Sequence, residues 1–308
     1  MTSKMPNLPA YVSGKNPATI YLDSLGSPRS AVTMKNCLDH VATIFGKQDV
    51  LDCDWSALRR NHIQFVINKL RSRKIAPSTI NLYLYAMKGV AKEAFSSDLM
   101  PQAAYLKITI MKGLTYQRLP VGRSLTAYQC KKLLNSCDDS LRGKRDKALL
   151  ALMMGCGLRR AEIVSLKLEH WNCKDSTFTF VGKGNKQRKV YLPPDLEAIM
   201  TDWLQARGQE EGTLFPAIYK GSGDPVMKFK DMQPSSVYRI VQRYAKKAKI
   251  PTITPHDLRR TFASRMLDAG VDLFVLQQSM GHSSLATTAR YDRRGDKAKA
   301  KAARSLRF

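Results

Sequence analysis

Helical spacing of apolar residues is the feature that most restricts the fold of this chain. Leu38, Val41 and Phe45 show the pattern, which runs from about residue 16 to residue 95 and returns after residue 235. Apolar residues three and four positions apart form one face of a helix that packs against a core. The alternation typical of strands is convincing only over 177–181 and 187–192, on either side of a glycine-rich turn. We therefore expect a mainly α fold with one small β-sheet.

Breaks in this pattern divide the chain into two expected domains, for which 308 residues are sufficient. In the first domain, Ser78 is expected to cap a helix. The segment before the second domain combines basic residues with two glycines and a proline, which is typical of a linker. Thr126 is expected to cap the first helix of the second domain. The expected divisions are 1–15 (N-terminal extension), 16–106 (helical domain), 107–123 (basic linker), 124–291 (second domain) and 292–308 (basic tail).

The charge of the chain indicates a polyanionic partner. It has 51 Lys and Arg against 25 Asp and Glu, a formal net charge of +26. Such an excess is typical of proteins that bind nucleic acid. A membrane partner is disfavoured because there is no apolar run of about 18 residues and no signal peptide, so a cytoplasmic, DNA-associated protein is expected. The candidate DNA contacts, for which solvated side chains are the alternative, are Lys88, Lys92, Lys112, Arg118, Arg123 and Lys186.

Cysteine and histidine spacing argues against a metal site. The six cysteines include no C-x-x-C pair, and the five histidines include no pair at ligand spacing beside acidic residues. Reduced, mostly buried thiols are expected. A metal-dependent nuclease is accordingly disfavoured, and no cofactor is expected.

Several short motifs could carry chemistry. In the Thr-Pro-His-Asp-Leu-Arg segment at 254–259, the Thr, Pro and Asp mark a helix N-terminus, where His256 and Arg259 share a face beside anion-favouring N–H groups. Arg159 follows a glycine turn, with Glu162 one helical turn later. Each motif alone has a plain structural explanation, such as a cap, a surface ion pair, a solvated turn or a packing tyrosine.

Together these motifs resemble the tyrosine recombinase (phage integrase) family, which includes the Xer and Cre-like enzymes. The order and spacing of Gly157-Leu158-Arg159-x-x-Glu162, Gly182-Lys183-Gly184-Asn185-Lys186, His256-x-x-Arg259, Gly281-His282 and Tyr291 are similar to the family pattern throughout the second domain. The resemblance implies a two-domain clamp around DNA, with 124–291 as its catalytic domain. Arg260 departs from the pattern, because many relatives have histidine there, but that position is outside the catalytic set.

Carried over residue by residue, the resemblance implies that Arg159 and Arg259 clamp a phosphate and that Tyr291 attacks it. Lys183 is then the general acid for the leaving 5'-oxygen, and His256 the acceptor of the tyrosine proton. The remaining assignments are His282, which would bind the phosphate and position Tyr291, and the supporting carboxylates Glu162 and Asp257. A phosphotyrosine conserves the energy of the broken bond, so rejoining needs no ATP.

The same resemblance implies double-stranded DNA with a short specific core site as partner and a homo-tetramer on paired sites. It leaves open an accessory recombination protein, and either docking of the tail on a neighbouring protomer or a disordered tail. A mobile-element integrase or resolvase is the expected role, with Xer-like dimer resolution as the alternative. A type IB topoisomerase and a non-catalytic DNA-binding accessory protein are the competing classes. The former is disfavoured by the helical first domain, and the latter by the full set of catalytic-type residues.

Overall fold

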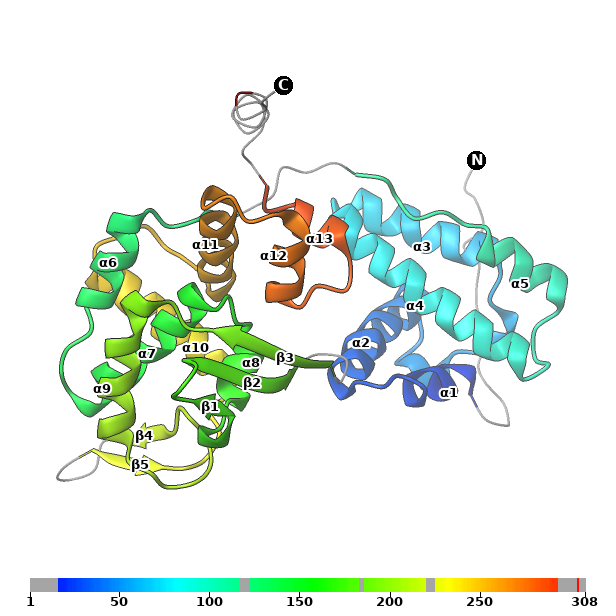
Figure 1. Ribbon diagram of the computed structural model, residues 1–308. Helices are drawn as coiled ribbons and strands as arrows, with labels where there is room; N and C mark the ends of the chain where they lie inside the picture. The colour runs from blue at the N-terminus through cyan, green and yellow to red at the C-terminus, as the bar shows by residue number, and fades with distance from the viewer. Residues whose placement is uncertain (1–15, 117–121, 183–185, 220–224, 293–303, 305–308) are drawn as a thin grey trace. The chain divides into compact units, whose positions relative to one another are not determined.

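The computed structural model describes residues 16–116, 122–182, 186–219, 225–292 and 304, and the chain divides into two compact units, Met1–Leu119 and Pro120–Phe308 (Figure 1). The expected extension 1–15 lies outside the described residues, as does all of the tail 292–308 except Asp292 and Arg304. Each unit has its own hydrophobic core. The expected mainly α fold with a small sheet is confirmed.

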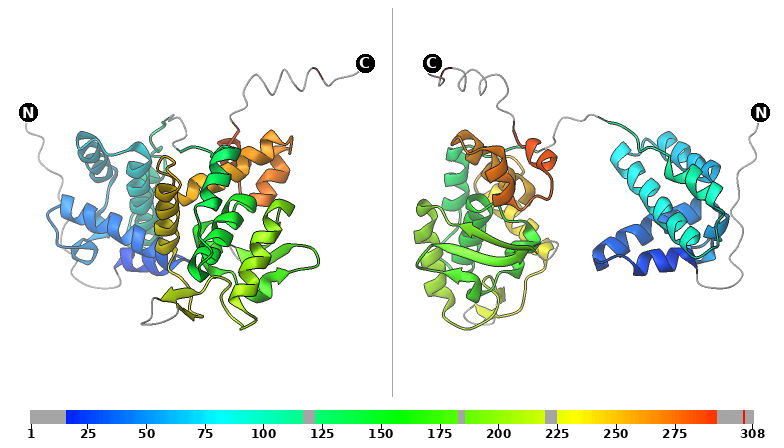
Figure 2. Two further views of the ribbon diagram at one scale, coloured as in Figure 1. Left: turned by 90° about the vertical axis from the view of Figure 1, so that its left-hand side faces the viewer. Right: turned by 45° about the vertical axis from the view of Figure 1, so that its right-hand side comes forward.

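The first unit is helical in its described part. Its helices are α1 (Pro17–Asp23), α2 (Pro28–Ile44), α3 (Arg60–Ser72), α4 (Pro77–Ser96) and α5 (Gln102–Thr109). Helix α4 is the centre of the unit, because α1, α2, α3 and α5 all pack against it (Figure 2). The predicted apolar face of Leu38, Val41 and Phe45 is buried in this core.

Two boundary predictions in the first unit are wrong in detail. Ser78 is not a cap, because Pro77 occupies the first helical position of α4 and Ala76 precedes it without a side-chain hydrogen bond. Helix α5 continues to Thr109, into the segment 107–123 interpreted as linker. It does so because Ile108 is fully buried against the core, which a solvated linker residue would not be.

The second unit places its helices around a small sheet (Figure 1). Its helices are α6 (Ala127–Asn135), α7 (Leu141–Gly155), α8 (Arg160–Ser165), α9 (Glu197–Arg207), α10 (Pro234–Lys247), α11 (Pro255–Asp268), α12 (Leu273–Met280) and α13 (Leu285–Ala289). Helix α7 is buried along most of its length and packs against α9 and α11.

The two predicted strands form an antiparallel pair, whereas the predicted turn between them, at 183–185, lies outside the described residues. Strand β2 (Thr177–Gly182) pairs with β3 (Lys186–Tyr191), and the short β1 (Trp171–Asn172) adds a third strand beside β2. A second sheet, β4 (Ala217–Tyr219) with β5 (Val226–Lys228), was not predicted. In β2 and β3, Phe178, Phe180 and Val190 point into the core.

Capping predictions in the second unit are confirmed. Thr126 caps α6 in a capping box with Gln129, and Thr254 caps α11 in a capping box with Asp257. Asp257 has a second task, because its Oδ1 accepts a hydrogen bond from the backbone N–H of Arg123 at 3.0 Å. The end of the linker is thereby attached to the start of α11.

All six cysteines are free thiols in the structure. Cys37, Cys53, Cys130, Cys137 and Cys156 are buried, whereas Cys173, between β1 and β2, is exposed. Burial raises the pKa of Cys53, Cys137 and Cys156 to about 12. Over the described ranges, no group of three or more His, Cys, Asp or Glu residues could hold a metal ion. Nor does any helix in this part of the chain have the length and apolarity needed to cross a membrane.

Candidate active site

The predicted site residues that the structure describes come together in the second unit. Arg159 immediately precedes α8, His256 and Arg259 lie near the start of α11, His282 follows α12, and Tyr291 follows α13. Helices α11, α12 and α13 lie on the same side of the β2–β3 hairpin (Figure 1). The site is therefore built mainly from helix ends, where unpaired backbone groups are available.

Arg259 is enclosed by hydrogen-bond acceptors. It is 3% exposed, and its guanidinium donates to the carbonyls of Gly157 and Met280 and to Nε2 of His282 at 2.9 Å. Burial and the neighbouring Arg159 lower the pKa of Arg259 to about 10. It therefore stays cationic at neutral pH while its geometry is fixed.

Arg159 is held on one side and open on the other. Its guanidinium donates to Glu162 Oε1 at 2.5 Å and to the carbonyl of Gly281 at 3.0 Å, yet 31% of its side chain is exposed. Gly281 and Met280 end α12, and a helix C-terminus carries unpaired carbonyls and partial negative charge. One helix end thus holds the guanidinium groups of both Arg159 and Arg259.

Glu162 is the buried carboxylate that joins the arginines. Its Oε2 accepts from the backbone N–H of Arg159 at 2.9 Å, which satisfies the N-cap donor at the start of α8. Burial alone would raise the pKa of Glu162, but that hydrogen bond and the charges of Arg188 and Arg159 lower it overall. Glu162 is accordingly ionised at neutral pH.

The sequence prediction missed a third arginine in this cluster. Arg188 is 9% exposed and donates from Nη1 to Glu162 Oε2 at 3.1 Å. A signal was present, since Arg188 is in phase with Val190 and Leu192, the inward positions of the predicted strand. A charged residue at an inward strand position is rare unless it has a partner.

His282 is a neutral imidazole with both nitrogens engaged. Because a guanidinium can only donate, Nε2 accepts from Arg259, and Nδ1 therefore carries the proton toward Thr288 Oγ1 at 2.8 Å. Burial and the charges of Arg259 and Arg159 lower the pKa of His282 to about 4. Its ring also stacks on Tyr291, with centroids 5.8 Å apart.

Tyr291 lies against His256. The phenolic oxygen is 3.4 Å from His256 Nε2, and Tyr291 as a whole is 7% exposed. Burial, followed by the charges of Arg260 and Arg259, lowers the pKa of His256. The imidazole is then neutral at neutral pH, and it can accept a proton from the phenol.

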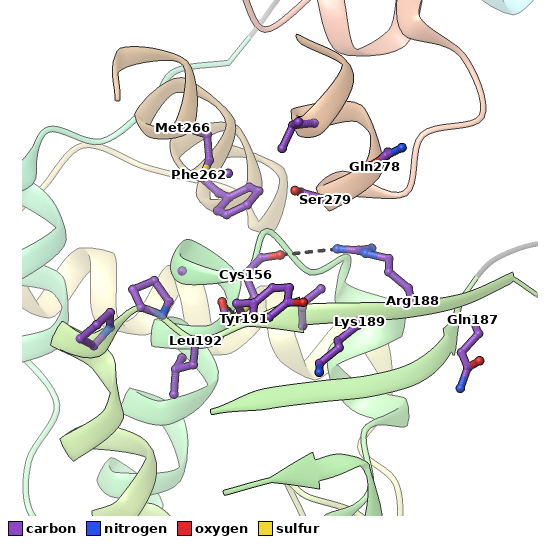
Figure 3. Close-up of a pocket in the computed structure, with 15 residues that line it drawn as sticks. Cys156, Gln187, Arg188, Lys189, Tyr191, Leu192, Phe262, Met266, Gln278 and Ser279 are labelled. Carbon is purple, nitrogen blue, oxygen red and sulfur yellow. Dashed lines mark hydrogen bonds between the residues drawn. The ribbon is translucent and has the colours of Figure 1, made fainter. Parts of the chain in front are cut away.

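Arg188 lines two pockets that adjoin this cluster. One, of about 590 Å³, is lined by Arg159, Glu162, Arg188 and His282. The other, of about 650 Å³, is lined by residues that include Arg188, Tyr191 and Phe262 (Figure 3). Only the first borders an exposed part of the arginine cluster, so it is the better place for an anionic group.

The remaining predicted residues have varied surroundings. Lys183 and Arg118 lie outside the described residues, and the side chain of Lys186 is not described. Lys92 and Lys112 are exposed. Lys88 donates to the carbonyls of Thr109 and Met111, and burial lowers its pKa, so it has a structural contact at the end of α5. Arg123 donates from its side chain to the carbonyl of Pro251.

Known proteins are similar to this chain in sequence and in fold. The phage integrase family matches residues 123–297. Tyrosine recombinase XerA of Pyrococcus furiosus is 31% identical over 245 residues, which are 79% of this chain and 79% of that protein. Among solved structures, XerH recombinase bound to a palindromic difH substrate has a TM-score of 0.67 at 18% identity, covering 93% of this chain and 92% of that one. The Tn1549 transposon integrase in complex with a circular intermediate DNA has a TM-score of 0.64 at 17% identity, covering 95% of this chain and 100% of that one. At these identities the structural likeness concerns the fold, whereas the sequence matches identify the family. The chain therefore belongs to the phage integrase family and is a tyrosine recombinase.

Proposed function

We propose that this protein cleaves and rejoins DNA strands at specific sites through a covalent bond between Tyr291 and a 3'-phosphate. The observation that carries the proposal is the placement of Tyr291 against His256 and His282, beside two arginines held by the end of α12. Such a cluster provides a nucleophile, a proton acceptor and fixed cations for a phosphodiester.

The cleavage step proceeds by in-line attack of the Tyr291 oxygen on phosphorus. The phenolic proton passes to His256 Nε2, the new Tyr291–phosphorus bond forms, and the bond from phosphorus to the 5'-oxygen breaks. The resemblance to the family supplies Lys183 as donor of the proton that the leaving 5'-oxygen needs. The products are a 3'-phosphotyrosine and a 5'-hydroxyl, and a 5'-hydroxyl from another strand reverses the step to rejoin DNA.

The arginine cluster stabilises the charge that develops on the phosphate. Arg159, Arg188 and Arg259 share the single carboxylate of Glu162, so the cluster keeps an excess positive charge. Cations fixed before the reaction gain strength as negative charge grows on the non-bridging oxygens. His282, whose Nε2 accepts from Arg259, orients that arginine in the DNA-free protein and supports the ring of Tyr291.

Double-stranded DNA with a short core site is the proposed substrate, and a tetramer on paired sites the proposed assembly. The net charge of +26 supports a DNA partner. We assign DNA binding by the first unit to its basic surface, including Lys92 and Lys112. Structural neighbours that are bound to a difH substrate and to a circular intermediate DNA support the same substrate class.

The biological role we propose is that of a mobile-element integrase or resolvase. The similarity to XerA favours a second candidate, Xer-like dimer resolution. Resolution is tested with a plasmid that carries two directly repeated copies of the core site. The plasmid is introduced into cells with and without the protein, and loss of the DNA between the copies is measured. Integration is tested by transfer of a site-bearing circle into a second site on another molecule.

The covalent step is tested with DNA from the protein's own genetic neighbourhood. Wild type, Tyr291→Phe and the matched control Tyr128→Phe, at a tyrosine 72% exposed on α6, are incubated with it and denatured. Wild type and Tyr128→Phe are expected to give protein attached to a 3'-end, and Tyr291→Phe to bind without attachment. An adduct that persists in Tyr291→Phe refutes the nucleophile, and binding without any adduct in wild type favours a non-catalytic DNA-binding protein.

A further inference from the structure

Arg188 occupies a position that the packing of the sheet assigns to an apolar residue. It pairs with Phe180 across β2 and β3 and points to the same side as Val190, whereas Lys189 points outward and has 44% of its side chain exposed. Its guanidinium lies 5.6 Å from the ring of Phe180. Burial of a cation at such a position has a desolvation cost that an aliphatic side chain would avoid.

The contacts of Arg188 join three parts of the site. Its Nη1 donates to Glu162 Oε2 at 3.1 Å, and its Nη2 is 3.5 Å from the carbonyl oxygen of Cys156, toward which the guanidinium points in Figure 3. Its Nε is buried without a partner among the described residues. A Cβ added at Gly281 would lie 3.1 Å from Arg188 Cδ, so the end of α12 closes directly over this side chain.

Glu162 Oε2 has two cations within reach. Arg188 Nη1 lies 3.1 Å from this oxygen, and Arg259 Nη1 lies 3.9 Å from it. Arg159 pairs with the other oxygen, Oε1. If Arg188 were absent, Oε2 would therefore have Arg259 as its nearest cation. Rotation of the carboxylate toward Arg259 would offset the charge of that arginine and distort the hydrogen bond from Arg159 to Glu162 Oε1, although both arginines would remain ion partners of Glu162.

We propose that Arg188 is a positioning residue for the cleavage reaction, which holds Glu162 so that Arg159 and Arg259 keep their orientation and charge toward the phosphate. The inference rests on the proposed function. Arg188 acts through Glu162 and the two arginines.

The contribution of Arg188 to the stability of the fold is expected to be small. Breaking a buried ion pair is costly when it leaves a buried charge uncompensated. Glu162 would still have Arg159 and Arg259 as partners, and one of three mutually repelling cations would be gone. Replacement of Arg188 by an unbranched apolar residue is therefore expected to leave the fold intact and to affect the reaction.

The test compares Arg188→Met, Arg188→Lys and the matched control Lys189→Met, which removes the same charge from the next position of β3. With saturating DNA, Arg188→Met is expected to slow adduct formation by about 10- to 100-fold. This is the effect expected when misplacement of Arg159 or Arg259 costs one charged hydrogen bond to the phosphate in the transition state. DNA affinity is expected to stay within about threefold of wild type. Arg188→Lys, which keeps the charge and an N–H donor group but loses the planar guanidinium, should recover part of the rate, and Lys189→Met should match wild type.

A double-mutant cycle with Glu162→Gln separates positioning from a general structural effect. If Arg188 acts through Glu162, Arg188→Met slows adduct formation much less in the Glu162→Gln background than in wild type. Equal slowing in both backgrounds, or a rate for Arg188→Met within about twofold of wild type, overturns the inference while the proposed function stands. If wild type forms no adduct under the same conditions, the proposed function fails and the inference fails with it. Should Arg188→Met not fold, Arg188→Lys takes its place in the same cycle, and equal slowing by Arg188→Lys in both backgrounds overturns the inference.

Discussion

Replacement of Glu162 by Gln tests the electrostatic account of the site through stability. The change removes the carboxylate that contacts all three arginines, with N–O distances of 2.5, 3.1 and 3.9 Å to Arg159, Arg188 and Arg259. Loss of one partner from a buried ion network leaves uncompensated charge and costs about 3–5 kcal/mol. For a unit of roughly 150–250 residues, each kcal/mol lowers Tm by about 2–4 °C, so a drop of about 6–20 °C is expected.

The assay is calorimetric unfolding of the full chain, with Glu169→Gln as matched control. Glu169 belongs to the same unit and pairs with Lys167 at 3.4 Å, but 69% of its side chain is exposed. Exposed pairs contribute about 1 kcal/mol or less, so the control should shift Tm by no more than about 4 °C.

The pH dependence of Tm provides an independent test of whether ionised Glu162 stabilises the fold. The pKa of Glu162 in the folded protein lies below its ordinary value of 4.5, so its stabilising contribution is complete above that value and is lost as pH falls through the folded pKa. The difference in Tm between wild type and Glu162→Gln should therefore be largest near neutral pH and shrink in acid. A difference no larger than that of Glu169→Gln, or one that grows in acid, refutes the reasoning.

Three further predictions concern catalysis and binding. The rate of adduct formation should fall as pH drops through the pKa of His256, which lies below the ordinary 6.5 because burial, Arg260 and Arg259 disfavour its charged form; an acid midpoint above 6.5, or one unchanged in His256→Gln, contradicts this assignment. Gly281→Ala should cost roughly 1–2 kcal/mol of stability, because Gly281 has φ +62°, and should slow adduct formation more than it weakens DNA binding, since the new Cβ meets Arg188; unchanged cleavage and unfolding curves would argue against both effects. Affinity for core-site DNA, measured by titration, should fall by about 1,000-fold or more between roughly 50 and 200 mM salt if six or more phosphates are contacted, and a nearly flat salt dependence would exclude a phosphate-dominated interface.

Local chemistry explains which parts of the fold could be predicted from the sequence. The caps at Thr126 and Thr254 depend on residues three positions apart, and both predictions are confirmed. The β2–β3 pair has long enough alternation to be recognised. Strands β4 and β5 have three residues each, too few for alternation to stand out. At Ser78 two start signals competed, and proline at the first helical position decided the boundary.

For the candidate site, the sequence predicted which residues take part but not how they contact one another. The motifs, through their resemblance to the tyrosine recombinase family, point to Arg159, His256, Arg259 and His282, and the structure brings them together with Tyr291. The contacts between them could not be predicted, because they join distant segments. The hydrogen bond from Arg159 to Gly281, for example, spans 122 positions and depends on how α12 packs. Arg188 was missed because the strand was predicted from its apolar residues alone. The charged residue at an inward-facing position, two residues before Val190, was not considered.

The uneven burial of the cysteines makes the protein easy to label at one position. A thiol reacts with maleimides as the thiolate, so an enclosed side chain with a raised pKa reacts slowly. Five of the six thiols are enclosed, and Cys173 in the β1–β2 turn is the exposed one. A fluorophore attached there would report on the second unit during DNA binding without any engineered cysteine or any change to Tyr291 and its neighbours.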